Sequence, residues 1–135
     1  MTDFLKMHGL GNDFIIFDWR DGGPATVSEA AARALADRRT GIGCDQILVI
    51  RPSDRADIRM DILNHDGSPS GVCGNGTRCV ADLVMESGMG PGTDRPLTIE
   101  TDGADLRAWR AGADISVDMG PVATGWADVP LANAA

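Results

Sequence analysis

The chain is 135 residues long and 43% hydrophobic, which is enough for one domain with a single packed core. Aromatic residues make up only 4% and glycines number 17, so we expect a sheet-rich fold with an aliphatic core and many turns. The net charge of -8 argues against nucleic acid or an anionic membrane as a partner, and no apolar run reaches the roughly 20 residues of a membrane span.

The first half of the chain predicts four strands, at residues 4–7, 14–18, 47–50 and 58–64. A glycine-containing turn joins the first two strands into a hairpin. Ile58, Met60 and Ile62 alternate with other residues, so one face of the fourth strand is expected to lie in the core.

Two helices are predicted. Ser28 is placed to cap a helix through residues 29–39, and Gly41 is positioned to end it. The apolar face of this helix is expected to consist of Ala30, Ala31, Ala34 and Leu35. A second helix is predicted at residues 75–87, with Gly88 as its stop, and its apolar spacing implies burial.

Three further strands are predicted within residues 96–120, joined by tight turns at residues 102–103 and at Gly112. The last residues have no clear period. We therefore predict one domain at residues 1–120, followed at residues 121–135 by a tail or the start of a linker.

The number of cysteines bears on the cellular compartment. Cys44, Cys73 and Cys79 cannot all pair within one chain, and the opening residues lack the basic-then-apolar order of a signal peptide. We expect a cytoplasmic protein whose cysteines remain thiols.

Cys73 is the strongest candidate for a reactive group. It lies directly before the second predicted helix, and glycines on both sides of Asn75 leave the backbone amides free to face an anion. The positive end of the helix dipole favours the thiolate, which acts as a base or nucleophile. The alternative is a small buried hydrophobic residue beside a glycine turn, and the position alone leaves both interpretations open.

The other cysteines and the histidines give weaker signals. Cys79 falls in the apolar stripe of the helix and Cys44 in a glycine-rich turn without a basic neighbour, so both are expected to be structural. A Cys73–Cys79 disulfide is disfavoured because both residues lie on or beside one helix in a reducing compartment. His8 and His65 lack the spacing of a zinc motif, so no metal site is predicted.

Three neutral amides are candidate ligand-binding groups. Asn12, Gln46 and Asn64 each stand at a predicted strand end or turn, and each can both donate and accept hydrogen bonds. Such groups suit a zwitterionic ligand. Taken singly, each is also an ordinary turn residue.

Four segments together resemble diaminopimelate epimerases in sequence, order and spacing. They are KMHGLGNDF at residues 6–14, GIGCDQ at residues 41–46, NHDGS at residues 64–68 and CGNGTRC at residues 73–79. The resemblance extends from residue 4 to about residue 120. CGNGxRC is more specific than any single glycine motif.

The resemblance implies an isomerase that interconverts LL- and meso-diaminopimelate, on the route to lysine and peptidoglycan precursors, without pyridoxal phosphate or another cofactor. In this family two cysteines face opposite sides of the α-carbon. One removes a proton as a thiolate, and the other delivers a proton as a thiol. Cys73 matches the first of the two.

The same resemblance assigns the remaining site residues. Asn12, Gln46 and Asn64 are expected to bind the amino and carboxylate groups of the substrate, and the main-chain amides of Gly74 and Asn75 to hold its α-carboxylate. The implied fold is α+β, with two similar halves. Each half is a mostly antiparallel sheet wrapped around a central helix.

The chain departs from the family pattern in length, because the second half with the partner cysteine has no counterpart after residue 120. Its partner is therefore expected to be the missing carboxy-terminal half, with a homodimer left open, and the isolated chain is expected to be inactive or nearly so. Cys44 occupies a slot that is usually apolar in the family, and the sequence assigns it no function.

Two alternatives remain open at the level of sequence. One is a proline or hydroxyproline racemase of the same fold, although Asn75 stands where those enzymes typically have His. The other is a non-catalytic domain that kept the anion-binding pocket.

Overall fold

The computed structural model describes residues 3–24, 26–71, 73–88 and 95–119. The predicted tail at residues 121–135, and with it the predicted domain boundary, lies outside these ranges. Among the described residues, no helix is long and apolar enough to cross a membrane.

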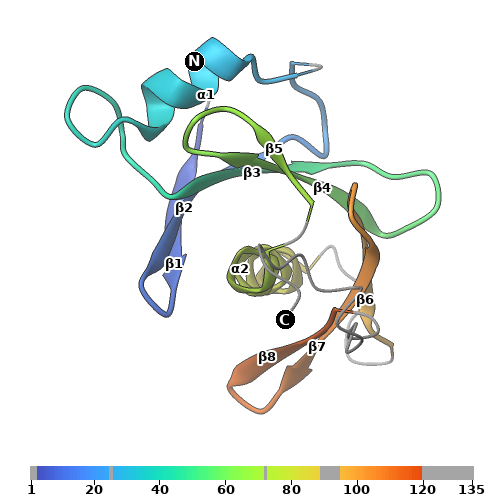
Figure 1. Ribbon diagram of the computed structural model, residues 1–135. Coiled ribbons are helices and arrows are strands. Elements are labelled where there is room, and N and C mark those ends of the chain that lie inside the picture. Colours follow the sequence, from blue (N-terminus) through green and yellow to red (C-terminus); the bar gives the residue numbers. More distant parts are fainter. Residues whose placement is uncertain (1–2, 25, 72, 89–94, 120–135) are drawn as a thin grey trace, which may run out of the picture.

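The described residues form one curved sheet in the order β1-β2-β3-β4-β6-β7-β8, with β5 paired to β4 (Figure 1). The strands are β1 (Leu5–Gly9), β2 (Asn12–Asp18), β3 (Gln46–Arg51), β4 (Ile58–Asn64), β5 (Pro69–Ser70), β6 (Leu97–Glu100), β7 (Asp105–Ala111) and β8 (Asp114–Asp118). Only the β2–β3 and β4–β6 pairings in this described part are parallel. The predicted α+β fold with a mostly antiparallel sheet is confirmed.

Two helices lie on opposite sides of this sheet. α2 (Gly74–Glu86) lies inside the curve of the sheet, and α1 (Glu29–Ala36) lies on the outer face (Figure 1). The buried residues of α2 contact the strands that curve around it. The prediction of a central helix is thus also confirmed.

The alternation of side chains along the strands separates the core into two layers. Phe14 and Ile16 of β2 pack with Val80 and Val84 of α2 on the inner face, whereas Ile15 packs toward α1 on the outer face. Successive side chains of a strand point to opposite faces. The run of four buried residues at 14–17 therefore marks a strand that is covered on both sides.

α1 is shorter than predicted, and its buried face is different. The helix ends at Ala36 because Asp37 is extended and its carboxylate accepts the N–H groups of Arg39 and Thr40, at 2.8 and 3.1 Å. The buried alanines are Ala32 and Ala36, whereas the predicted face is exposed except for half-buried Leu35.

The segment after β4 contains a short strand that the sequence analysis did not predict. Pro69 and Ser70 form the short strand β5, which returns along the end of β4 with Leu63 opposite Pro69. Two residues are too few to display a strand period, so no sequence pattern indicates this element. β5 leads the chain toward Cys73.

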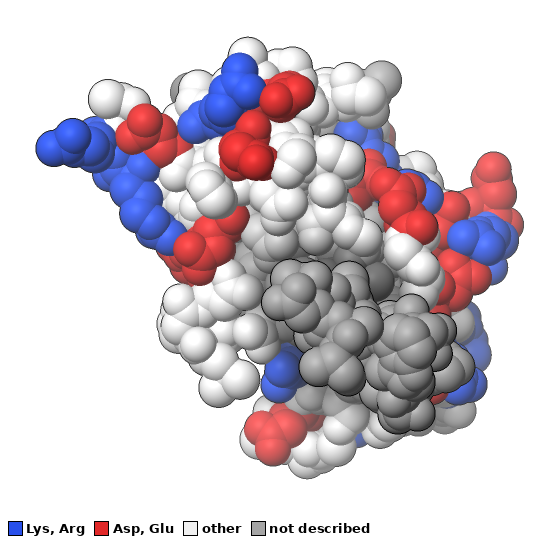
Figure 2. Space-filling model, in the orientation of Figure 1, with Lys and Arg blue, Asp and Glu red and all other residues white. Residues whose placement is uncertain are grey.

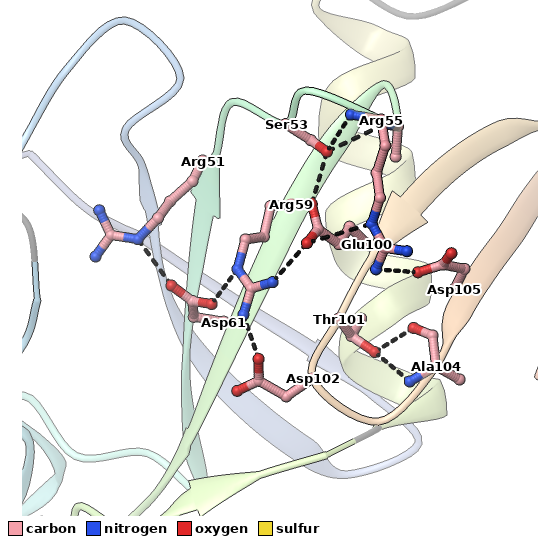
Figure 3. A network of polar contacts seen from close by, with 11 residues as sticks. Arg51, Ser53, Arg55, Arg59, Asp61, Glu100, Thr101, Asp102, Ala104 and Asp105 are labelled. Atoms are coloured by element: carbon pink, nitrogen blue, oxygen red, sulfur yellow. Dashed lines mark hydrogen bonds and ion pairs between the residues drawn. The ribbon is translucent and has the colours of Figure 1, made fainter.

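A network of polar side chains spans the outer face of β3, β4 and the turn after β6 (Figure 3). The Arg59 guanidinium donates to Asp61 and Glu100, each at 2.9 Å, and also to Asp102. Arg51 donates to the other oxygen of Asp61 at 2.7 Å. These bonds reinforce the join between β4 and β6, whose ladder covers only two residue pairs.

Charges of both signs are mixed on the surface. On the face shown in Figure 2, Lys and Arg residues lie beside Asp and Glu residues, and no large patch of one sign is visible. Most of the basic side chains are engaged in ion pairs with carboxylates. On this face the acidic residues are therefore interspersed with basic ones instead of forming a single patch.

Candidate functional site

The sheet topology brings the three predicted binding amides to one edge. Asn12 begins β2, Gln46 begins the parallel neighbour β3, and Asn64 ends the antiparallel strand β4. The register places Gln46 opposite Asn64 and opposite Phe14. Residues that are 52 positions apart in sequence, from 12 to 64, thus lie at the same edge of the sheet.

The same three amides are expected on the inner face of the sheet, next to α2. Asn12 is two residues from Phe14, Gln46 two residues from Leu48, and Asn64 two residues from Ile62, and these apolar residues all belong to the α2 core. Residues i and i+2 of a strand share a face. The amides therefore extend the inner face of the sheet beyond its apolar core, and all three are half-buried.

Gln46 and Asn64 orient each other. The Gln46 amide donates from Nε2 to the Asn64 Oδ1 at 3.0 Å, and the Asn64 Nδ2 donates to the Ser68 Oγ at 3.1 Å. Ser68 in turn is bound by Asp66. This series of hydrogen bonds fixes the orientation of each side-chain amide. It therefore also fixes which hydrogen-bonding groups remain for a ligand.

Cys73 is the N-cap residue of α2. Its Sγ accepts the main-chain N–H of Gly76 at 3.3 Å, and its carbonyl accepts the N–H and the hydroxyl of Thr77 at 2.9 and 2.7 Å. The side chain is half-buried. The sulfur thus lies at the N-terminal end of α2, against a main-chain donor of its first turn.

Asn12 links the amide edge to this cysteine, since its Nδ2 lies 4.0 Å from the Cys73 Sγ. This is a long contact, at the limit for a hydrogen bond to sulfur. Within the ranges that the structure describes, no hydrogen bond joins the Gln46–Asn64 pair to Cys73. The two groups share the sheet edge without direct contact.

The first amides of α2 are not used by the described part of the chain. None of the described residues accepts the main-chain N–H of Gly74 or Asn75, whereas the Asn75 side chain is held by Arg78 at 2.9 Å. Gly74 and Arg78 also line a groove of about 360 Å³ beside β8, with Ile115, Ser116, Val117 and Met119. Within the described ranges, these two amides are thus available to an anionic group.

Cys44 and Cys79 lie in the core, at 2% and 6% exposure. Burial is the main cause that raises the pKa of both thiols above its usual value. For Cys44, burial outweighs a backbone hydrogen bond with Ile15 and the charges of Lys6 and Arg38, which act to lower the pKa and are distant in sequence.

No metal site is formed by the residues described here, since no group of three His, Cys, Asp or Glu side chains converges. His8 lies on β1 opposite Asp13, and His65 is exposed in the turn after β4. The two histidines are therefore on separate elements.

Sequence inspection missed the acidic residues next to two of the candidate amides. Asp13 follows Asn12 and Asp45 precedes Gln46, and in the structure the two carboxylates meet around Arg38. The only signal in the sequence is that GNDF and GCDQ each pair an amide with an adjacent Asp.

Comparison with known proteins gives a consistent result. The sequence profile of the family described as diaminopimelate epimerase matches residues 4–124. A diaminopimelate epimerase from Rhodospirillum centenum is 52% identical over 97% of this chain and 44% of its own length. One from Acidiphilium cryptum is 50% identical over 98% of this chain and 46% of its own length. The chain thus spans slightly less than half of these relatives.

Solved structures resemble this chain in fold. A probable proline racemase from Agrobacterium radiobacter K84 superimposes with a TM-score of 0.63 at 20% identity, over 80% of this chain and 37% of that protein. Methylitaconate-delta-isomerase superimposes with a TM-score of 0.64 at 16% identity, over 79% of this chain and 33% of that protein. At such identities the likeness concerns the fold alone.

Proposed function

This chain belongs to the diaminopimelate epimerase family, and from that premise we propose that the full-length protein containing it interconverts LL- and meso-diaminopimelate. In this proposal the chain supplies one half of the active site, and the reaction needs no cofactor. The product serves the synthesis of lysine and of peptidoglycan precursors. The protein acts as a cytoplasmic isomerase.

One observation carries the proposal. The Cys73 Sγ accepts an N–H at the start of α2 and lies 4.0 Å from the Asn12 amide, at the sheet edge that also holds Gln46 and Asn64. A thiolate can remove the α-proton of an amino acid, and main-chain donors and neutral amides can bind its charged groups. Their convergence supports an amino-acid substrate.

We assign the proton transfer to Cys73. Its thiolate takes the α-proton, and the electron pair of the broken C–H bond moves onto the α-carbon and its carboxylate. The main-chain N–H groups of Gly74 and Asn75 stabilise this added negative charge, as fixed donors do best when water is excluded. Asn12, Gln46 and Asn64 hold the remaining polar groups of the substrate.

Inversion also needs an acid on the opposite face of the α-carbon. We propose that a second thiol, in the part of the protein that follows this chain, donates that proton. Cys44 and Cys79 do not suit this role because both are buried. One half alone therefore removes a proton without completing the inversion.

The test is α-proton exchange in deuterated water with LL-diaminopimelate and the full-length protein. We expect Cys73→Ala to lower the exchange rate by about 10²- to 10⁴-fold, the usual contribution of a general base. Cys44→Ala is the matched control, because it removes a thiol that is buried in the core layer facing α1, on the other side of the sheet from Cys73, and is expected to leave exchange near the wild-type rate.

Unchanged exchange in Cys73→Ala would overturn the assignment of the base. Turnover of proline in place of diaminopimelate would move the chain to the racemases that share its fold. Binding of diaminopimelate without exchange in the wild-type protein would indicate a domain that binds an anion without catalysis.

A further inference from the structure

Four charged side chains form a compact cluster on the outer face of the sheet, and we name it the polar clamp. Its members are Lys6, Asp13, Arg38 and Asp45. They come from β1, from β2, from the turn after α1 and from the loop before β3. Two positive and two negative groups balance, so the clamp is neutral as a whole.

The two carboxylates of the clamp tie β2 to β3. The Asp13 N–H donates to the Asp45 carboxylate at 3.0 Å, and the Asp45 N–H donates to the Asp13 carboxylate at 3.0 Å. The Asp45 N–H also donates to the Asp13 carbonyl at 3.0 Å. This reciprocal pair stands immediately before the first register pair of the parallel ladder, which is Phe14 with Gln46.

Arg38 joins the carboxylates that would otherwise repel each other. Its guanidinium binds both oxygens of Asp13, at 3.0 and 2.7 Å, and one oxygen of Asp45 at 2.9 Å. Such fork-shaped binding fixes direction as well as distance. The hydrogen bonds from Arg38 hold the pKa of the Asp13 carboxyl well below its usual value. Desolvation acts to raise this pKa, and Lys6 acts to lower it further.

The backbone keeps Arg38 in this position. Gly43 has a φ of +85°, and a Cβ built on it would lie 3.1 Å from the Arg38 Cα. The Gly43 carbonyl in turn accepts a hydrogen bond from the Lys6 ammonium. The loop before β3 is therefore packed directly against the residue that bridges the two carboxylates.

The clamp lies on the opposite face of the sheet from the binding amides. Lys6 is opposite Ile15, whose side chain packs toward α1, and Asp13 alternates with the inward-facing Phe14. The clamp residues thus have no access to a ligand on the α2 side. However, Asp13 directly follows Asn12 in the sequence, and Asp45 directly precedes Gln46.

We propose that Arg38 is a positioning residue for the substrate amides, acting through Asp13 and Asp45. By fixing the separation of the first residues of β2 and β3 on one face, it sets the separation of Asn12 and Gln46 on the other. This inference rests on the proposed role of Asn12 and Gln46 in binding the substrate.

The test compares three variants of the full-length protein. Arg38→Gln removes the fork and the charge, Arg38→Lys keeps the charge without the fork, and Arg39→Gln is the matched control at an exposed neighbour whose side chain has no partner among the described residues. The measurements are kcat, KM for LL-diaminopimelate, the thermal midpoint, and the side-chain amide NMR signals of Asn12 and Gln46.

We expect Arg38→Gln to raise KM roughly 10-fold or more and to shift or broaden both amide signals, since displacement of positioning groups by about 1 Å can reduce rates 10²-fold. Arg38→Lys folds with its charge intact and is expected to raise KM by a smaller factor, and Arg39→Gln to leave it unchanged. A purely structural role would lower the thermal midpoint and leave KM of the folded protein unchanged, which would overturn the proposal.

Failure of the proposed function has a different signature. If Asn12→Ala and Gln46→Ala leave KM at the wild-type value, the amides do not bind substrate, whatever Arg38 does. If these two variants raise KM while both Arg38 variants keep the wild-type KM and amide signals, only the clamp proposal is wrong.

Discussion

The three cysteines of the chain differ in their surroundings. Cys73 is half-buried at the start of α2, where a main-chain N–H reaches its sulfur, whereas Cys44 and Cys79 are almost fully buried. Burial raises the pKa of the last two thiols and so reduces their thiolate fraction at neutral pH. Position in the fold thus separates one half-buried thiol from two buried ones.

We therefore predict selective alkylation of Cys73 in the folded chain. Iodoacetamide is expected to modify it at least about 10-fold faster than the other two cysteines, because thiolate and access both govern the rate. Peptide mass spectrometry after timed quenching measures the three rates. In denaturant the rates should converge, and equal rates in the folded chain would contradict the prediction.

The backbone conformation of Leu10 is expected to lower the stability of the fold. It lies in the turn between β1 and β2 with a φ of 54°, followed by Gly11 with a φ of 84°, and its side chain is 86% exposed. Two positive φ values are typical of a type I′ hairpin turn, which favours Asn-Gly over Leu-Gly. The leucine is thus in a left-handed conformation without the compensation of burial.

Leu10→Asn is expected to raise the free energy of unfolding by about 0.5–1 kcal/mol, since Asn adopts the left-handed region more readily. Urea denaturation measures the change. Leu5→Asn is the matched control, because Leu5 is also exposed but lies in β1, where Asn is a poor strand former. If Leu5→Asn raised the free energy of unfolding by the same amount, the gain in Leu10→Asn would come from removal of an exposed leucine and not from the turn conformation.

At the scale of elements, the pairing of β4 with β6 is held by side-chain hydrogen bonds more than by backbone hydrogen bonds. The Asp57 carboxylate accepts the N–H and hydroxyl of Thr98, at 2.9 and 3.0 Å, and both terminal nitrogens of Arg95, at 2.7 Å each. The hydrogen bonds from Arg95 are the main cause that lowers the pKa of Asp57 to about 2. This carboxylate connects two strands that are parallel neighbours for only two residue pairs.

The lowered pKa gives the sign of a pH effect. The stabilisation from Asp57 is fully present above its unfolded pKa, near 3.8, and is lost as the pH falls toward about 2. Asp57→Asn is expected to cost about 1–2 kcal/mol at pH 7, allowing for solvent screening, and the deficit should shrink between pH 4 and pH 2.

Denaturation curves of both proteins across this pH range measure the effect. Asp54→Asn serves as the control, because Asp54 is exposed and its side chain has no hydrogen bond within the described residues. A deficit that is constant from pH 7 to pH 2 would show that the Asp57 charge is not what holds the two strands together.

At the scale of the whole molecule, the described residues form one curved sheet around α2, and the chain spans less than half the length of the relatives compared above. The start of α2 and the amide-bearing strand ends lie at one side of this unit. In the proposed mechanism these groups supply a base for one face of the substrate carbon, and the donor for the other face comes from the part of the protein that follows this chain.

We predict that the isolated 135-residue chain does not convert LL- to meso-diaminopimelate, whereas the full-length protein does. Chiral chromatography of the product, with equal molar amounts of both proteins, measures the difference. Conversion by the isolated chain at the full-length rate would mean that the second proton donor lies within these 135 residues, and would remove the reason for a partner half.

Local patterns in the sequence predicted most of the elements and the candidate site residues. The alternation at Ile58, Met60 and Ile62 is a property of a single strand, and the glycines around Cys73 are a property of one helix start, so both could be interpreted without knowledge of the rest. The family motifs are equally local, and they predicted an α+β fold with a central helix, which the structure confirms.

Only the tertiary structure decided how these pieces combine. Asp13 and Asp45 are 32 residues apart, and Arg38 is 25 residues from Asp13, so their contacts depend on the register of parallel strands and on the path of a loop. The early end of α1 depends on the Asp37 side chain bonding to the turn that follows. Periodicity reports which face of an element is buried, but it contains no information on which distant residue that face meets, because that choice is made by packing of the whole chain.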